Sequence, residues 1–166
     1  MPALAFRPTV AYAGRSRLVF QPALGDDMDK LDQLYAMQRD LNEYIFRKQD
    51  LGEDAWEEFI ERKATPEAMR DWTLNLCRAL INEGVELEDS CNWKWWSNDP
   101  PIDLQNARVE VIDLWHFLLS LSMVVGLKPE DIFELYSKKY EVNKKRQDQG
   151  YSRDSKTEDD NKDLSV

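Results

Sequence analysis

Two pairs of acidic residues interrupt apolar stretches of the sequence at a spacing that suits joint binding of a metal ion. Glu83 and Glu86 are three residues apart, as are Glu110 and Asp113, so in helices each pair shares a face, on or beside the side that faces the core. Buried together without compensation, such charges cost on the order of several kcal/mol each. Oxygen ligands without His or Cys suit Mg²⁺, with Mn²⁺ as the alternative. The competing interpretation places these acids at the rim, paired with Arg or Lys, because a chain with 32 acidic residues produces such spacings by chance.

An aromatic segment follows the first acid pair. It reads Trp93-Lys94-Trp95-Trp96 and precedes Asp99-Pro100-Pro101, which cannot continue a helix. One interpretation is a ring that stacks on a nucleobase while Lys94 faces phosphate. The other is a small satellite core under a loop, and the segment by itself does not decide between them.

A cationic stripe lies near the C-terminus. Lys139, Asn143 and Arg146 recur at i, i+4 and i+7, and Gly150-Tyr151 follows them. Such a stripe could hold phosphate, because Arg binds it with two parallel hydrogen bonds and Lys as a point charge. The alternative is a solvated helix face.

Gln38 and Asn42 form an amide pair at i and i+4 in the first helical region. A side-chain amide in a pocket can donate and accept at once, which suits the edge of a pyrimidine. Spacing alone favours amides on the helix surface, with Leu31, Leu34, Leu41 and Ile45 on the apolar face. The single histidine, His116, is expected at the core or its boundary rather than as a catalyst.

The elements that must position these residues are helices. Apolar periodicity predicts five of them, over residues 27–48, 55–62, 66–90, 104–125 and 129–147. Thr65-Pro66 and Pro129 are start signals, and Gly126 is a stop signal. No segment alternates as a strand does, so the fold class is all-α, a bundle of about five helices in which the 104–125 helix is central.

Composition bounds the function classes. The 166 residues are 42% hydrophobic with a net charge of -10, which indicates a packed core and an acidic surface that repels nucleic acid. Two cysteines without zinc spacing exclude a disulfide framework and favour a reducing, cytoplasmic compartment. No apolar run approaches the roughly 20 residues of a membrane-spanning helix, so no membrane partner is expected.

The ends of the chain differ from its middle. Residues 1–25 carry arginines and no acid, which fits a flexible extension better than an organelle-targeting segment. Residues 152–166 are polar and acidic and fit a disordered tail. The predicted domain therefore spans residues 26–151.

Together these motifs resemble the dimeric dUTPases, within the all-α nucleoside triphosphate pyrophosphatase superfamily that includes the MazG proteins. The resemblance rests on Gln38-x-x-x-Asn42, on Glu83-Gly-Val-Glu86-Leu87 with the Trp93–Trp96 segment, on Glu110-Val-Ile-Asp113-Leu-Trp115-His116-Phe117, and on Lys139-x-x-x-Asn143-x-x-Arg146-Gln147-x-x-Gly150-Tyr151. It extends from Met28 to Tyr151. The second and fourth motifs point to the dUTPase branch.

The resemblance implies Mg²⁺-dependent hydrolysis of dUTP to dUMP and pyrophosphate, with dUDP as a second candidate, by a homodimer that supplies dUMP and keeps uracil out of DNA. It makes Glu83, Glu86, Glu110 and Asp113 metal ligands, with Glu83 or Glu86 activating water. Gln38 and Asn42 would read uracil, with Trp93 or Trp96 packing on its ring, and Asp113 would also approach the sugar. The expected phosphate and sugar contacts are Lys94, Lys139, Asn143, Arg146 and Tyr151.

Two features depart from that family. Ser97 stands where members often carry a basic residue, and the chain lacks the insertions of the larger members. Two alternatives stay open: the same chemistry on dCTP or another nucleotide, and a helical interaction module without activity.

Overall fold

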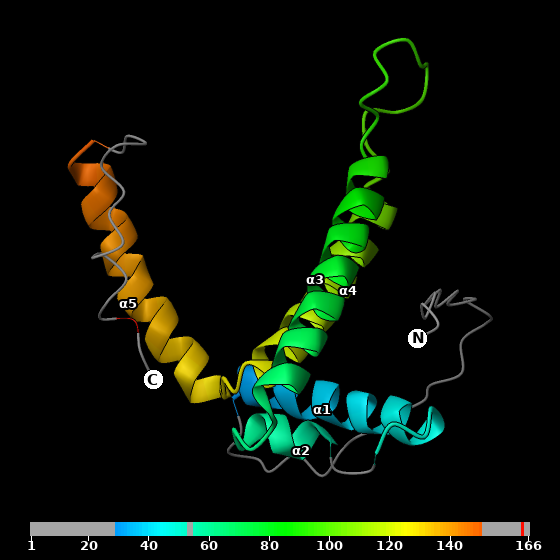
Figure 1. Cartoon of the computed structure of the whole chain (residues 1–166). Coiled ribbons are helices and arrows are strands. Elements are labelled where there is room, and N and C mark those ends of the chain that lie inside the picture. The colour runs from blue at the N-terminus through cyan, green and yellow to red at the C-terminus, as the bar shows by residue number, and fades with distance from the viewer. Residues whose placement is uncertain (1–28, 53–54, 151–163, 165–166) are drawn as a thin grey trace.

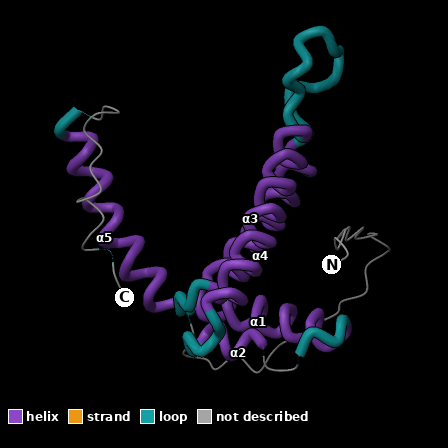
Figure 2. Tube along the Cα trace, viewed as in Figure 1, coloured by secondary structure: helices purple, strands orange, loops and turns teal. Residues whose placement is uncertain are grey.

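The computed structural model describes residues 29–52, 55–150 and 164, and within them the chain forms five helices and no strand. The helices are α1 (Lys30–Lys48), α2 (Ala55–Ile60), α3 (Pro66–Asp89), α4 (Leu104–Val124) and α5 (Pro129–Asp148). Helices α3 and α4 run side by side as a long hairpin, α1 and α2 lie across its base, and α5 diverges from it (Figures 1 and 2). The predicted all-α class is confirmed.

Local sequence signals set the helix ends. Asp29 caps α1 by accepting hydrogen bonds from the backbone of Leu31 at 2.8 Å and Asp32 at 3.0 Å, so α1 begins at Lys30 rather than at residue 27. Thr65 caps α3 as predicted, by accepting from the Ala68 backbone at 3.2 Å. Helix α2 ends at Ile60 because the chain turns at Arg62, whose φ is 58°.

The core lies at the base of the hairpin, where α1, α2, α3 and α4 meet. The Phe46 ring lies 5.2 Å from the Trp56 ring and 4.8 Å from the Trp72 ring, between centroids. Met123 and Val124 of α4 are fully buried in the same cluster. Helix α4 therefore has the central place that its apolar sequence predicts.

The buried face of α1 differs from the predicted one. Leu34 and Leu41 are exposed, whereas the buried residues of α1 are Tyr35, Gln38, Asn42 and Phe46. The aromatic side chains of Tyr35 and Phe46 fill the core, and both amides find polar partners on α4. Burial is thus decided by contacts that the leucine pattern alone does not reveal.

The turn after α4 directs α5 away from the hairpin. Gly126 ends α4 with φ of 73°, as predicted, and Arg62 Nε donates to its carbonyl at 3.1 Å. The Arg62 guanidinium also pairs with Asp131 at 2.9 Å, and the hydroxyl of Tyr35 donates to the Leu127 carbonyl at 2.8 Å. These contacts tie the turn to α1 and to the segment after α2.

Among the described residues, no single helix has the length and apolar composition needed to cross a membrane. By length and composition alone, α4 and α5 pass that test only as a pair bent by 102°. The predicted extension over residues 1–25, Tyr151, and all of the predicted tail except Leu164 lie outside the described residues.

Candidate active site

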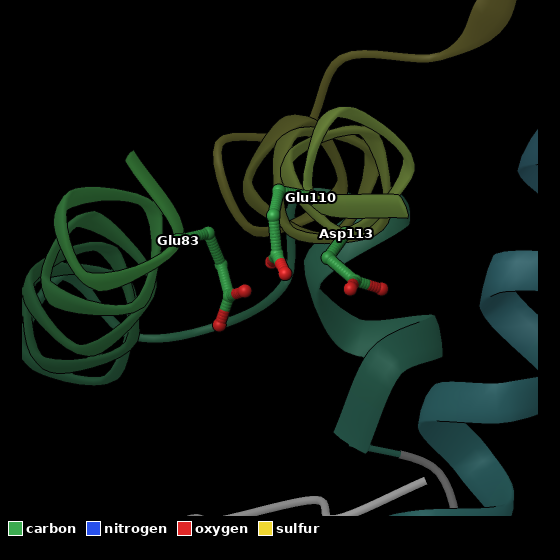
Figure 3. Close-up of side chains that lie close together, drawn as sticks. All are labelled: Glu83, Glu110 and Asp113. Atoms are coloured by element: carbon green, nitrogen blue, oxygen red, sulfur yellow. The ribbon is translucent and has the colours of Figure 1, made fainter. Parts of the chain in front are cut away.

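Three of the four predicted metal ligands converge between α3 and α4. One carboxylate oxygen from each of Glu83, Glu110 and Asp113 lies within 4.8 Å of the other two. Figure 3 shows Glu83 reaching from α3 toward Glu110 on α4, with Asp113 beside Glu110 on the same helix. The antiparallel hairpin brings the two pairs to the same level, which the sequence spacing within each pair cannot do alone.

The site is electrostatically unfavourable without a counter-charge. Burial raises the pKa of the Glu110 carboxyl, and the charges of Glu86 and Asp113 raise it further against an opposing hydrogen bond from Asn106. Burial also raises the pKa of Glu83, and the repulsion of Glu86, Asp113 and Glu110 adds to it. The folded chain therefore holds like charges at a cost.

Glu86 stands at the edge of this group. Its side chain is exposed and accepts a hydrogen bond from Asn82 Nδ2 at 2.6 Å, and it is not among the three residues with converging oxygens. Its charge still acts on Glu83 and Glu110. Glu86 therefore acts on the cluster through its charge but is not part of the converging group.

The donor set fits a hard divalent cation. All the converging atoms are carboxylate oxygens, the ligand type that Mg²⁺ and Mn²⁺ prefer. Within the described part of the chain, no ion pair joins Lys or Arg to Glu83, Glu86, Glu110 or Asp113. The interpretation of these acids as rim residues paired with cations therefore finds no support in the described residues.

The amide pair is buried rather than on the surface. Gln38 and Asn42 are each about 5% exposed, and Gln38 Nε2 donates to Asn42 Oδ1 at 2.9 Å and to Ser120 Oγ at 3.0 Å. The imidazole of His116 contacts Gln38 Oε1. The surface interpretation of the amides is therefore wrong. His116 makes this contact although it is exposed, not at the core or its boundary as predicted.

Ser120 was not singled out from the sequence, although a signal was present. His116 and Ser120 are polar, four residues apart, and interrupt the most apolar stretch of α4. The buried hydroxyl of Ser120 needs hydrogen-bond partners, and the amides of α1 supply them.

The aromatic segment forms the loop at the far end of the hairpin (Figure 1). The loop is closed by a single antiparallel bridge between Cys91 and Ile102. The Trp96 ring meets Trp93 at 6.0 Å and Trp95 at 5.4 Å, both edge to face, and Lys94 lies over the Trp93 ring at 5.7 Å. The three tryptophans are 56–88% exposed, so they form an open aromatic surface rather than a satellite core.

The cationic stripe is not brought to the carboxylates within one chain. Lys139, Asn143 and Arg146 lie on α5, which diverges from the α3–α4 hairpin (Figure 1). Arg146 is buried, and Asn143 is exposed.

The family of this chain follows from comparison with known proteins. The sequence profile of a dUTPase family matches residues 30–131, which contain the carboxylates, the amide pair and the aromatic loop. The chain belongs to this dUTPase family. This membership confirms the resemblance seen in the sequence. The closing motif on α5 lies beyond the residues that the dUTPase profile matches.

Two curated relatives carry a different substrate in their names. The dCTP pyrophosphatase of Enterobacteria phage T4 is 29% identical over 149 residues, covering 77% of this chain and 86% of the relative. The dCTP pyrophosphatase of Enterobacteria phage LZ5 is 33% identical over 78 residues, covering 40% of this chain and 45% of the relative. No solved structure gave a significant match. Together with the dUTPase family, these relatives support a nucleoside triphosphate pyrophosphatase.

Proposed function

We propose that this dUTPase-family chain hydrolyses dUTP to dUMP and pyrophosphate in a Mg²⁺-dependent reaction, with dUDP as a second substrate. The observation that carries the proposal is the convergence of Glu83, Glu110 and Asp113 in a chain of this family. The same chemistry on dCTP is the second candidate, because both curated relatives are named dCTP pyrophosphatases.

In this proposal, Glu83, Glu110 and Asp113 hold Mg²⁺, with Glu86 as a further ligand. The bound ion would supply neutralisation of the triphosphate and a lowered pKa for a coordinated water. Glu83 or Glu86 accepts the proton of the attacking water while the anhydride bond between the α- and β-phosphates breaks.

The remaining residues bind and orient the substrate. Gln38 and Asn42 read the pyrimidine, and a tryptophan of the loop, Trp93 or Trp96, packs on its ring. Because the loop lies at the end of the hairpin away from α1, that tryptophan would come from a second copy of the chain. Lys94, Lys139, Asn143, Arg146 and Tyr151 contact the phosphates and the sugar, and Asp113 also approaches the sugar hydroxyl. One donor–acceptor order of the amides suits one pyrimidine, and the rotated order suits the other.

We also propose a homodimer. Apolar side chains are exposed along the hairpin and α5, among them Ile81 at 68%, Ile112 at 55%, Phe133 at 72% and Tyr136 at 75%. The cationic stripe of α5 complements the carboxylates of the hairpin in charge. A second copy would cover these faces, and sedimentation analysis tests this by giving twice the chain mass.

The deciding experiment measures pyrophosphate and phosphate release from dUTP, dUDP, dCTP, dTTP, dATP and dGTP, with and without Mg²⁺. A Mg²⁺-dependent preference for dUTP supports the first candidate, and a preference for dCTP supports the second. Glu83→Gln and Asp113→Asn should abolish turnover while the fold survives. Hydrolysis of none of the six, with a melting temperature that Mg²⁺ leaves unchanged, would favour the interaction module.

A further inference from the structure

A hydrogen-bond network between α1 and α4 joins the buried side chains of Gln38, Asn42, Ser120 and Met123 to the exposed imidazole of His116. Asn42 Nδ2 lies 3.7 Å from Met123 Sδ, and Met123 is fully buried. A thioether sulfur accepts hydrogen bonds and never donates them. The Asn42 amide therefore turns its nitrogen toward Met123 and its oxygen, Oδ1, toward Gln38.

The orientation of the Asn42 amide then determines the orientation of the Gln38 amide. Asn42 Oδ1 lies 2.9 Å from the Gln38 amide, so Gln38 must present its nitrogen there, since two carbonyl oxygens at that distance repel. Ser120 Oγ lies 3.0 Å from Gln38 Nε2, 3.1 Å from Asn42 Nδ2 and 3.2 Å from Asn42 Oδ1, so it does not by itself favour one order of Asn42. Its hydroxyl can donate to Asn42 Oδ1 or to the His116 carbonyl at 3.0 Å. Gln38 Oε1 is thereby left facing the imidazole of His116.

A carbonyl oxygen only accepts, so the contact between Gln38 Oε1 and His116 Nδ1 requires a proton on Nδ1. We propose that His116 is a positioning residue that locks the Gln38–Asn42 amide pair in one donor–acceptor order by donating from Nδ1–H to Gln38. Without that donor, only the Met123 thioether, a weak acceptor at the other end of the network, is left to oppose a joint rotation of the two amides. Rotation of Gln38 would also force Asn42 to rotate.

This inference rests on the proposed function where it concerns substrate choice. Uracil and cytosine offer opposite hydrogen-bonding groups at the same ring positions, since the carbonyl O4 of uracil accepts and the amino N4 of cytosine donates. An amide pair held in one order distinguishes them, and a pair free to rotate accommodates both. His116 therefore determines selectivity without touching the base.

The first test reads the proton directly and needs no substrate. His116 is the only histidine of the chain, so its imidazole gives one set of ¹⁵N signals. We expect the neutral imidazole of the full chain, observed at alkaline pH, to carry its proton on Nδ1. In Gln38→Met, the proton should move to Nε2, the position that free imidazole favours. A bare Nδ1 in the unsubstituted protein overturns the proposal, whatever the enzyme hydrolyses.

The second test measures selectivity as the ratio of kcat/KM for dUTP to that for dCTP. His116→Asn keeps a donor near the place of Nδ1, and His116→Phe removes it. We expect the preference to fall about tenfold in His116→Phe, with the ratio held within about threefold in His116→Asn. Ser122→Ala, which removes another α4 hydroxyl, bonded to the Leu118 carbonyl at 2.9 Å, is the matched control.

The two tests separate the possible failures. Equal losses of selectivity in His116→Asn and His116→Phe would indicate a purely structural role and overturn the positioning assignment. If the unsubstituted protein hydrolyses neither nucleotide, the proposed function fails while the tautomer measurement still decides whether His116 orients the amides.

Discussion

Replacement of Glu110 by glutamine should stabilise the metal-free protein while it removes turnover. Glu110 is 8% exposed, and burial and the charges of Glu86 and Asp113 all raise its pKa. A raised carboxyl pKa means that the folded state binds a proton more tightly than the unfolded state does. At neutral pH the ionised carboxylate therefore lowers the free energy of unfolding, and glutamine removes that charge.

The size of the effect follows from the separation of the carboxylate oxygens. At 4.8 Å, one like-charge pair costs roughly 1 kcal/mol in a water-like dielectric and roughly 3.5 kcal/mol at the effective dielectric of a protein surface. The site opens to solvent at Glu83 and Asp113, so about 1–3 kcal/mol is the expected gain. For a chain of this length, that gain corresponds to a rise in melting temperature of roughly 3–10 °C.

Thermal unfolding of the metal-free proteins, with and without added Mg²⁺, measures both consequences. Mg²⁺ should raise the melting temperature of the unsubstituted protein, because binding adds about 2.7 kcal/mol to the free energy of unfolding at a hundredfold excess over Kd. The rise should be much smaller in Glu110→Gln. Without metal, the difference in melting temperature between Glu110→Gln and the unsubstituted protein should shrink as the pH falls through the raised pKa of Glu110. At that pH the Glu110 carboxyl is itself protonated and no longer carries the charge that glutamine removes.

Glu141→Gln is the matched control, since it makes the same charge change on the exposed face of α5. A similar stabilisation by Glu141→Gln would attribute the effect to net charge instead of the cluster. The reasoning is refuted if metal-free Glu110→Gln melts at or below the temperature of the unsubstituted protein, or if it keeps the full Mg²⁺ shift.

Three further substitutions test separate parts of the argument. Gly84→Ala should raise the free energy of unfolding by about 0.5–1 kcal/mol, because alanine is favoured over glycine in mid-helix and the new Cβ meets nothing within 4 Å. Calorimetry measures this change, and a destabilised variant would contradict the prediction. Gly126→Ala should lower the free energy of unfolding by about 1–3 kcal/mol, because φ is 73° and the new Cβ would lie 2.8 Å from Arg62 Cγ. An unchanged midpoint in denaturant unfolding would show that the turn relaxes without cost. Asn42→Ala should lower the discrimination between dUTP and dCTP in competition assays, and an unchanged ratio would remove Asn42 from base recognition.

Much of the candidate site was predictable because its residues lie close together in sequence. The i and i+3 spacing of Glu110 and Asp113 places both on one face of α4, and the capping residue Thr65 and the stop residue Gly126 mark helix ends. These are local effects of one or two helical turns. The helical period is therefore enough to predict these features, without information about contacts between distant segments.

The burial of the amide pair was not predictable in this way. Leucines at positions 34 and 41 gave α1 an apolar face, yet the structure buries Gln38 and Asn42 and exposes those leucines. The deciding partners, Ser120 and His116, are about 80 residues away in the chain. Buried amides are stable only where such partners exist, and a single helix does not contain them.

The sequence by itself determined the all-α class, the number of helices, most of their ends to within one or two residues, and the family resemblance, because helical period, capping and motif spacing are local properties. Only the tertiary structure decided that Glu83 meets Glu110 and Asp113 while Glu86 stays at the edge, and that α5 diverges from the hairpin. Those outcomes depend on how two antiparallel helices align and how one turn at Gly126 is held. Both are set by packing between segments far apart in the chain.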